Sequence, residues 1–394
     1  MTRARRLDGE YYTAMASSFH LFSIGGIRIG VHWSWFFVAV LLTWTFSAEI
    51  YTPEETGWDP NQRWIAGVAT AVVFFAAVLL HELSHSLMAR RLGMTVDSIT
   101  LFIFGGSSNL RDEMKSAKTE FLVAVVGPLT SFALAGLLFI VYLALRDRSP
   151  FVDVGVGYLA AVNLVLGVFN LIPGFPLDGG RVLRSIIWGA NHDLVKATFV
   201  VSRVGIGFAY LLIAGGFLLL FADAWIGGIW WIMIGFFLRG ASEASYTQLV
   251  VRRATSGVTA GDIVDRTFKA VEPAMTLREL VDQEIFRHSL RAFPVFGGGR
   301  FLGLVTLSDV KRFEREQWAA TTVYQAMTPI DKLATVGIRA PIEEILQLLG
   351  TRDVNQVPVV SGQDLVGFVT RGHVMNVIQV RTELGAEEAG PGSV

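Results

Sequence analysis

The feature that most limits the possible folds is a series of long apolar segments in the first two thirds of the chain. Six of them are long enough to cross about 30 Å of hydrocarbon as helices. They run approximately over residues 31–49, 63–92, 119–145, 152–172, 197–221 and 225–246. The 394 residues are 52% hydrophobic and only 17% charged, with a mean hydropathy of +0.49. The sequence therefore predicts a mainly α-helical membrane domain with six transmembrane helices.

Basic residues indicate how these segments are oriented. They gather before the first predicted span, after the second and the fourth, and at the end of the sixth, which places them on one side if six spans alternate. The opposite side carries the acidic loop AEIYTPEETGWDP, and Arg146 and Arg148 are the exceptions. We therefore predict a multi-pass protein of the cell membrane, inner or plasma, with both termini in the cytoplasm.

Short strands are expected at the membrane edge. FHLFSIGGIRIGVHW, before the first span, mixes β-branched residues with glycines, a pattern typical of strands. LFIFGGSSNL, after the second span, indicates a strand-like loop that returns toward the membrane. The backbone at Gly105 and Gly106 can pair there with an extended substrate by strand addition, and a plain turn is the alternative.

The last third of the chain has the composition of a soluble α/β region and contains an internal repeat. AFPVFGGGRFLGLVTLSDVKRFE, from Ala292, aligns with QVPVVSGQDLVGFVTRGHVMNVI, from Gln356, and an amphipathic stretch precedes each copy. Each unit is expected to run strand, helix, strand, tight turn, strand, helix. We divide the chain into a membrane domain, a linker, two repeats and a disordered tail, at 1–246, 247–257, 258–313, 314–382 and 383–394.

Two features of the composition limit the metal ligands and the partners that the chain can have. The chain has no cysteine, which excludes disulfides, thiol nucleophiles and thiolate metal sites, so that any metal must be held by His, Asp or Glu. The net charge of −1 also argues against a nucleic-acid partner.

The second span ends in LLHELSHSL, where three ionisable side chains interrupt an apolar run. A charge at the centre of a bilayer costs at least about 2.5 kcal/mol, so such residues usually have a function. The spacing places His81 and His85 on one face of a helix, where both imidazoles can bind one zinc ion while Glu82 takes a proton from the bound water. The alternative is a polar helix end that happens to carry two histidines.

A zinc hydrolase needs a third protein ligand and an open fourth position. The best candidate is Asp178 in NLIPGFPLDGG, where two prolines and three glycines break the fourth span. Unwound backbone at membrane depth is tolerated only where it is buried in protein or lines a cavity, although a simple helix-ending turn is the alternative. The second and fourth spans run in the same direction, which brings both motifs to one depth. Asp193, His192 and Glu113 compete for the role from loops that look more cytoplasmic.

Asn170, in the same segment, can donate a hydrogen bond to a substrate backbone or to the oxyanion that forms at the carbonyl. The alternative for this residue is helix packing by a polar side chain.

HELSHSLMARRLG, FGGSSNL, VGPLTSF and NLIPGFPLDGGRVL, in this order across six predicted spans, resemble the site-2 protease family of intramembrane zinc metalloproteases. The resemblance covers nearly the whole membrane region. It implies that His81, His85 and Asp178 bind one zinc ion per subunit, that Glu82 is the catalytic base and that Asn170 assists substrate binding. Family members cut membrane-anchored substrates such as anti-sigma or pro-sigma factors. Without a PDZ-like insertion, the chain resembles the branch with a C-terminal CBS pair, which includes the sporulation sigma-factor proteases.

The two repeats resemble CBS domains, which pair into a Bateman module. In that family a strand followed by G-h-x-[ST]-x-x-D places a hydroxyl near phosphate and the aspartate on ribose. The first repeat has Thr306 and Asp309 at these positions, whereas the second has Thr370 followed by His373 in place of the aspartate. That departure weakens the case for an adenine nucleotide in the second site. A dimerisation module without a ligand is the alternative, and a homodimer is expected through the CBS pair.

Together these features predict a zinc endopeptidase of the lipid bilayer that hydrolyses peptide bonds in membrane-anchored protein substrates, with activity modulated through the CBS pair. The rival is a CBS-regulated transporter or channel, in which the same four ionisable groups form an ion or proton path. The rival does not require a glutamate between two histidines at positions i and i+4. A metal-binding scaffold without catalysis is a third reading.

Overall fold

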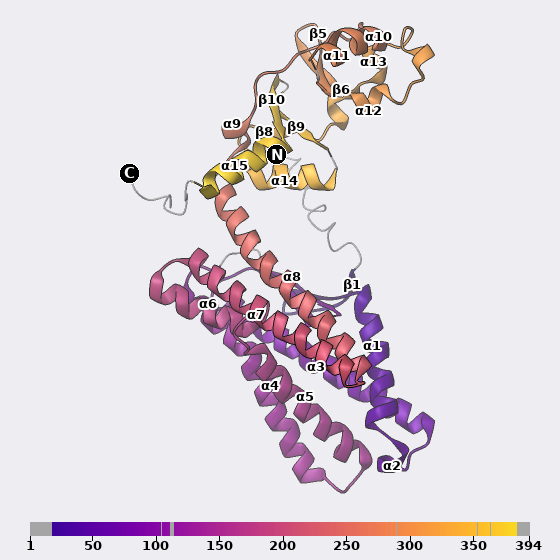
Figure 1. Cartoon of the computed structure of the whole chain (residues 1–394), viewed down its shortest axis with the longest axis vertical. Helices are drawn as coiled ribbons and strands as arrows, with labels where there is room; N and C mark the ends of the chain where they lie inside the picture. The colour runs from indigo at the N-terminus through magenta and orange to yellow at the C-terminus, as the bar shows by residue number, and fades with distance from the viewer. Residues whose placement is uncertain are drawn as a thin grey trace. The chain divides into compact units, whose positions relative to one another are not determined.

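The computed structural model describes residues 18–103, 105–110, 114–288, 290–352, 354–362 and 364–383. The chain divides into two compact units, Met1–Gln248 and Leu249–Val394, which are described separately. Figure 1 follows the chain from the helical first unit, drawn in indigo to magenta, into the α/β second unit, drawn in orange to yellow.

The first unit consists mainly of long apolar helices. They are α1 (Trp33–Thr45), α3 (Pro60–Arg91), α4 (Ala117–Leu145), α5 (Gly157–Asn170), α7 (Leu194–Phe221) and α8 (Trp225–Thr255), with the shorter α2 (Pro53–Thr56) and α6 (Asp178–Asn191). The residues of α8 after Gln248 belong to the second unit. Five segments are long and apolar enough to cross a membrane: Trp33–Ile50, Pro60–Arg91, Ala117–Leu145, Phe151–Asn170 and Leu194–Phe221. These match the first five predicted spans. The sixth, 225–246, lies within α8, which is not among the five, so the count of six stays a prediction.

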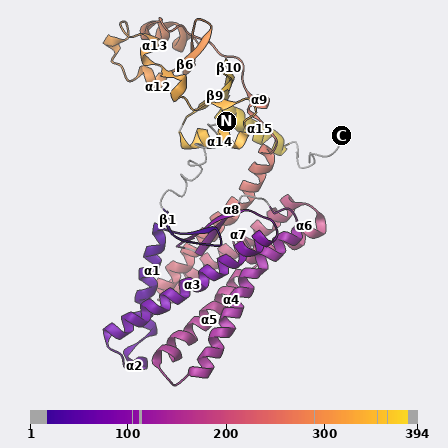
Figure 2. The same ribbon diagram turned by 180° about the vertical axis from the view of Figure 1, so that it is seen from behind.

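Polar residues at the helix starts explain where the long helices begin. α3 starts behind Asp59, whose carboxylate accepts from the backbone of Gln62 in a capping box, with Pro60 at the first helical position. Ser116 caps α4 by accepting from the backbone of Thr119. α4 packs against α3, α5 and α6, and the views in Figures 1 and 2 show these helices side by side. α4 therefore lies at the centre of the elements that carry the ionisable motifs.

The predicted strands form one sheet at one end of the helices. Its order is β1 (Ser18–Ile24), β2 (Ile27–His32), β3 (Val96–Phe102) and β4 (Gly105–Leu110). β2 and β3 pair in parallel, and the other pairs are antiparallel. Ile27, Ile29 and Ile99 are fully buried in one cluster with Leu83 and Ala89 of α3. The sheet is thus fixed to the end of α3 that carries the HExxH motif.

The segment after Asn170 contains an element that the sequence did not reveal. Residues 171–177 form the predicted break, and a helix, α6, follows it that was not among the predicted elements. Glycine has a low helix propensity, so Gly179 and Gly180 in the first turn of α6 gave no sign of a helix in the sequence. They are required by packing, because a Cβ on Gly179 would lie 2.2 Å from the carbonyl oxygen of Leu171. Asp178 is therefore the first residue of a helix that begins where the break ends.

The second unit has the predicted repeat. The first copy runs through α10 (Leu277–Glu279), η4 (Leu280–Ile285), α11 (Phe286–His288), β5 (Ala292–Gly297), β6 (Arg300–Thr306) and α12 (Leu307–Val310), and the second through β8 (Val336–Gly337), α14 (Ile342–Thr351), β9 (Gln356–Ser361), β10 (Asp364–Thr370) and α15 (Arg371–Glu383). In the first copy the leading strand is reduced to a bridge between Val271 and Val295. The predicted linker is helical as far as Thr255, and residues 384–394 of the predicted tail lie outside the described residues.

Candidate metal centre

α3 places two imidazoles side by side in the protein interior. His81 and His85 are one helical turn apart and are 4% and 5% exposed. Their Nε2 atoms lie 3.3 Å from each other. Both histidines thus present the same ring nitrogen to one point in space.

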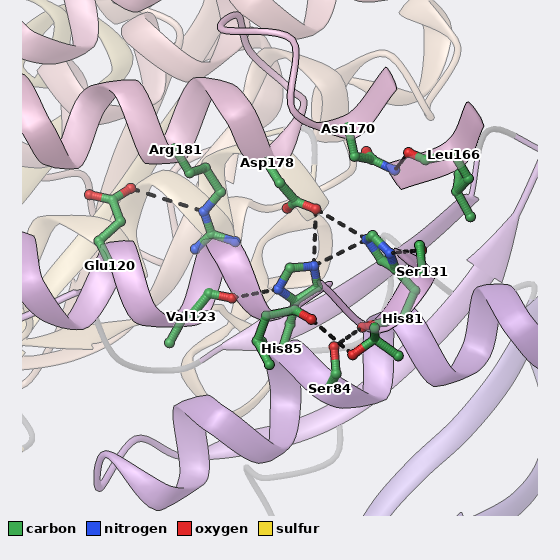
Figure 3. Close-up of polar contacts among 12 residues, drawn as sticks. His81, Ser84, His85, Glu120, Val123, Ser131, Leu166, Asn170, Asp178 and Arg181 are labelled. Atoms are coloured by element: carbon green, nitrogen blue, oxygen red, sulfur yellow. Dashed lines mark hydrogen bonds and ion pairs between the residues drawn. The ribbon is translucent and has the colours of Figure 1, made fainter. Parts of the chain in front are cut away.

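Asp178 of α6 meets both of these nitrogens. Its Oδ2 atom lies 3.1 Å from Nε2 of His81 and 3.1 Å from Nε2 of His85, and Figure 3 shows the carboxylate reaching both rings. The three ligand atoms lie within 4.8 Å of one another. Residues more than 90 positions apart therefore converge as the topology predicted, and their role as metal ligands stays a prediction.

The competing third ligands do not join this group. Asp193 caps α7, where its carboxylate accepts from the backbone N–H of Lys196 at 2.9 Å, and His192 ends α6. Glu113 lies outside the described residues. Across the described residues, His81, His85 and Asp178 are the one group of three His, Asp or Glu side chains with this proximity.

The donor atoms and the space between them suit a metal ion. His85 Nδ1 lies 2.6 Å from the carbonyl oxygen of Val123, which can only accept, so Nδ1 carries the proton and the neutral ring has a lone pair on Nε2. That lone pair and the Asp178 carboxylate are both acceptors, so a cation or a proton must lie between them. A Cβ on Gly127 would lie 2.1 Å from His85 Nε2 and 2.7 Å from His81 Nε2. Two imidazoles and one carboxylate form a donor set typical of catalytic zinc sites.

Glu82 lies on α3 between the two histidines, half-buried, and β4 passes directly beside it. A Cβ on Gly106 would lie 2.3 Å from Glu82 Cγ. Gly105 has a φ of +132°, which a residue with a side chain rarely adopts. Gly106 is therefore the residue that lets an edge strand approach the glutamate, whereas Gly105 supplies the backbone conformation before it.

The loop before Asp178 is held from the other side by α7 and α8. The hydroxyl of Ser242, fully buried on α8, donates to the carbonyl oxygen of Phe175 at 2.5 Å. A Cβ on Gly174 would lie 2.6 Å from the Cα of Gly205 on α7. The irregular backbone is thus packed inside protein, the condition under which unwound backbone is tolerated within a membrane.

Comparison with known proteins agrees with this geometry. The model of Peptidase family M50 matches residues 69–150 and 151–214, and that of the CBS domain matches residues 260–316 and 323–380. A putative zinc metalloprotease of Synechocystis is 34% identical over 95% of this chain and 98% of its own length. This chain belongs to peptidase family M50.

Further relatives of this M50 zinc metalloprotease include the putative zinc metalloprotease Rip3 of Mycobacterium tuberculosis. It is 32% identical over 93% of this chain and 94% of its own length. The solved site-2 protease of Methanocaldococcus jannaschii is 27% identical, covers 58% of this chain and 95% of its own, and superposes with a TM-score of 0.43. The two family-model matches and the zinc metalloprotease relatives confirm the resemblance to the site-2 protease family with a CBS pair.

In this M50 protease Asn170 is the last residue of α5. Its amide nitrogen donates to the carbonyl oxygen of Leu166 at 3.1 Å, within the same helix, as Figure 3 shows. Its predicted contact with substrate stays a prediction.

The CBS residues singled out from the sequence serve as helix caps in this structure. Asp309, 3% exposed, accepts from the backbone N–H and the hydroxyl of Thr306, at 2.9 and 2.6 Å. The Thr370 hydroxyl accepts from the backbone N–H of His373 at 3.2 Å. Within the described part of the chain, the His373 side chain accepts no hydrogen bond from Thr370 in return. Nucleotide binding at these positions stays a prediction.

Sequence reasoning missed the polar partners that α4 supplies to the M50 site. Ser131, fully buried, lies 2.8 Å from His81 Nδ1. Glu120, also fully buried, pairs with Arg184 of α6 and lies 4.0 Å from Arg181. The available signal was a glutamate inside an apolar span, which is costly without a partner, whereas the two arginines had served only to orient the spans.

Proposed function

We propose that this M50 protease hydrolyses peptide bonds in membrane-anchored proteins, with one zinc ion held by His81, His85 and Asp178. The observation that carries the proposal is the meeting of two imidazole nitrogens with one carboxylate oxygen at 3.1 Å, beside Glu82. When bound there, zinc supplies Lewis-acid polarisation of the scissile carbonyl and activates water. The Glu82 carboxylate accepts the proton of the attacking water and passes it to the leaving amine.

The class of substrate follows from the surroundings of Glu82. Long apolar helices flank the site, so a substrate segment that reaches it comes from the membrane. A helical peptide bond is shielded by its own hydrogen bonds, so the segment must unwind before cleavage. β4 is an edge strand of its sheet and runs past Glu82 at Gly106. An extended substrate can therefore add to β4 through backbone hydrogen bonds, with Asn170 turning from Leu166 to hold the substrate or the oxyanion.

We also infer the setting of the enzyme. The distribution of basic residues supports a cell-membrane protein with both termini in the cytoplasm and a site that takes water from that side. Membrane-anchored anti-sigma or pro-sigma factors fit the substrate class. The CBS pair modulates activity, an adenine nucleotide is its candidate ligand at Thr306 and Asp309, and pairing of CBS modules makes the enzyme a homodimer.

The test compares wild type with Glu82→Gln, purified as the full chain, for bound zinc and for cleavage of a panel of single-span substrates. Glu243→Gln is the matched control, because Glu243 forms an exposed ion pair with Arg239 on α8. We expect all three proteins to bind zinc and Glu82→Gln to lose about 10²- to 10⁴-fold in cleavage rate. Zinc bound by wild type without cleavage of any substrate would contradict the proposal, and zinc-independent ion flux would favour a transporter.

A further inference from the structure

One face of α4 lies against both candidate histidine ligands. Val123, Gly127 and Ser131 follow one another at intervals of four residues and so share that face. Val123 offers its carbonyl oxygen to Nδ1 of His85 at 2.6 Å, and Ser131 offers its hydroxyl to Nδ1 of His81 at 2.8 Å. Gly127, between them, leaves room for the two Nε2 atoms. A helix without a ligand of its own thus contacts both imidazoles.

The contact of Ser131 differs from those of three other hydroxyls close to the candidate site. Thr130 donates to the carbonyl oxygen of Val126 at 2.8 Å, Ser84 to that of His81 at 2.6 Å and Ser185 to that of Val182 at 2.6 Å, each within its own helix. Ser131, with no exposed surface, instead reaches a side chain 50 positions away. A buried hydroxyl is costly unless it is hydrogen-bonded, so the bond to His81 accounts for a polar residue at this position.

The bond fixes the rotation of the ring, and it is compatible with the tautomer that metal binding requires. An imidazole held at Nδ1 cannot turn about its Cβ–Cγ bond without losing the contact. When the Ser131 oxygen accepts from Nδ1–H, the neutral ring keeps its lone pair on Nε2, the atom that lies 3.1 Å from Asp178 Oδ2. His85 reaches the same tautomer through Val123. Both rings then present a metal-binding nitrogen to the same point.

We propose that Ser131 is a positioning residue of the metal centre, which fixes the orientation of the His81 ring and accepts from Nδ1–H so that Nε2 can bind the metal. This inference rests on the proposed zinc site. Partners of metal-bound histidines raise the basicity of the ligand and lock the ring, and their loss typically lowers metal affinity or activity about 10- to 100-fold.

The experiment compares wild type, Ser131→Ala and Thr130→Ala as full chains in detergent. Thr130 is the matched control, because it neighbours Ser131 but bonds its own helix. Zinc affinity is measured by competition with a chromophoric chelator, and the visible spectrum of the cobalt-substituted protein reports ligand geometry. Ser131→Ala should bind zinc about 10- to 100-fold more weakly than wild type and shift the cobalt bands. Thr130→Ala should match wild type in both measurements.

Unchanged zinc affinity and an unchanged cobalt spectrum in Ser131→Ala, with zinc bound by wild type, would overturn the role of Ser131 and leave the proposed function intact. Failure of wild type to bind zinc would overturn the proposed function itself. Thermal unfolding of the metal-free proteins shows whether Ser131→Ala is folded. If it is not, Ser131→Thr and Ser131→Val, which differ in the hydroxyl at nearly equal volume, replace it. Tighter zinc binding by Ser131→Thr supports the role, and equal binding overturns it.

Discussion

The carboxylate of Glu120 on α4 accepts hydrogen bonds from the guanidinium of Arg184 on α6, across 64 positions of sequence. Nε of Arg184 lies 2.8 Å from Glu120 Oε1, and the Arg184 side chain also lies over the ring of Phe175 at 5.0 Å. Glu120 has no exposed surface. Because α6 begins with Asp178, this ion pair fixes the helix that carries the third candidate ligand.

Glu120→Gln is expected to destabilise the protein strongly. The substitution leaves the Arg184 guanidinium without a counter-charge, and breaking a buried pair in this way costs about 3–5 kcal/mol. Thermal unfolding in detergent measures the effect. Glu243→Gln, which removes an exposed partner of Arg239, should change stability by less than about 1 kcal/mol. Equal unfolding temperatures for the two variants would contradict a clamping role for Glu120.

Gly127→Ala is expected to abolish metal binding while the helix stays intact. The new Cβ would occupy the space next to both Nε2 atoms, at 2.1 and 2.7 Å, whereas alanine favours a helix over glycine by about 1 kcal/mol. Gly136→Ala on the same helix is the control, since a Cβ there meets nothing within 4 Å. Metal analysis should find zinc in Gly136→Ala but not in Gly127→Ala. Full zinc content in both would place the metal elsewhere.

His373→Asp is expected to stabilise the start of α15. In the first repeat Asp309 accepts from the backbone N–H of Thr306 at 2.9 Å, and the substitution would give Thr370 the same reciprocal bond. A capping residue contributes about 0.5–2 kcal/mol, so hydrogen exchange of the Thr370 amide should slow by severalfold. Unchanged exchange would show that the two repeats cap their helices differently. Asp309→Ala removes the corresponding bond in the first repeat and should speed exchange of the Thr306 amide.

Local patterns in the sequence were enough to predict the parts of the fold that depend on local chemistry. Apolar blocks marked the five apolar spans, and the internal repeat marked the CBS pair. The convergence of Asp178 with the histidines followed from span direction alone. These inferences rest on the hydrophobic pattern of each segment and on the charges counted along the chain.

Features that depend on contacts between distant segments stayed hidden. The parallel pairing of β2 with β3 joins Ile29 to Ile99, and no short-range pattern encodes it. The helix α6 was missed because its glycines are required by contacts with Leu171 and Gly174 rather than by helix propensity. Ser131 was one hydroxyl among many in an apolar span, and only the approach of α4 to α3 distinguishes it.

The most direct test of the metal centre compares zinc content and substrate cleavage in wild type, Asp178→Ala and Asp193→Ala. Asp193 is the matched control, because it competed for the third-ligand role in the sequence but caps α7 in the structure. We predict about one zinc per chain and cleavage in wild type and Asp193→Ala, with both lost in Asp178→Ala. Retention of zinc and cleavage by Asp178→Ala would contradict the account.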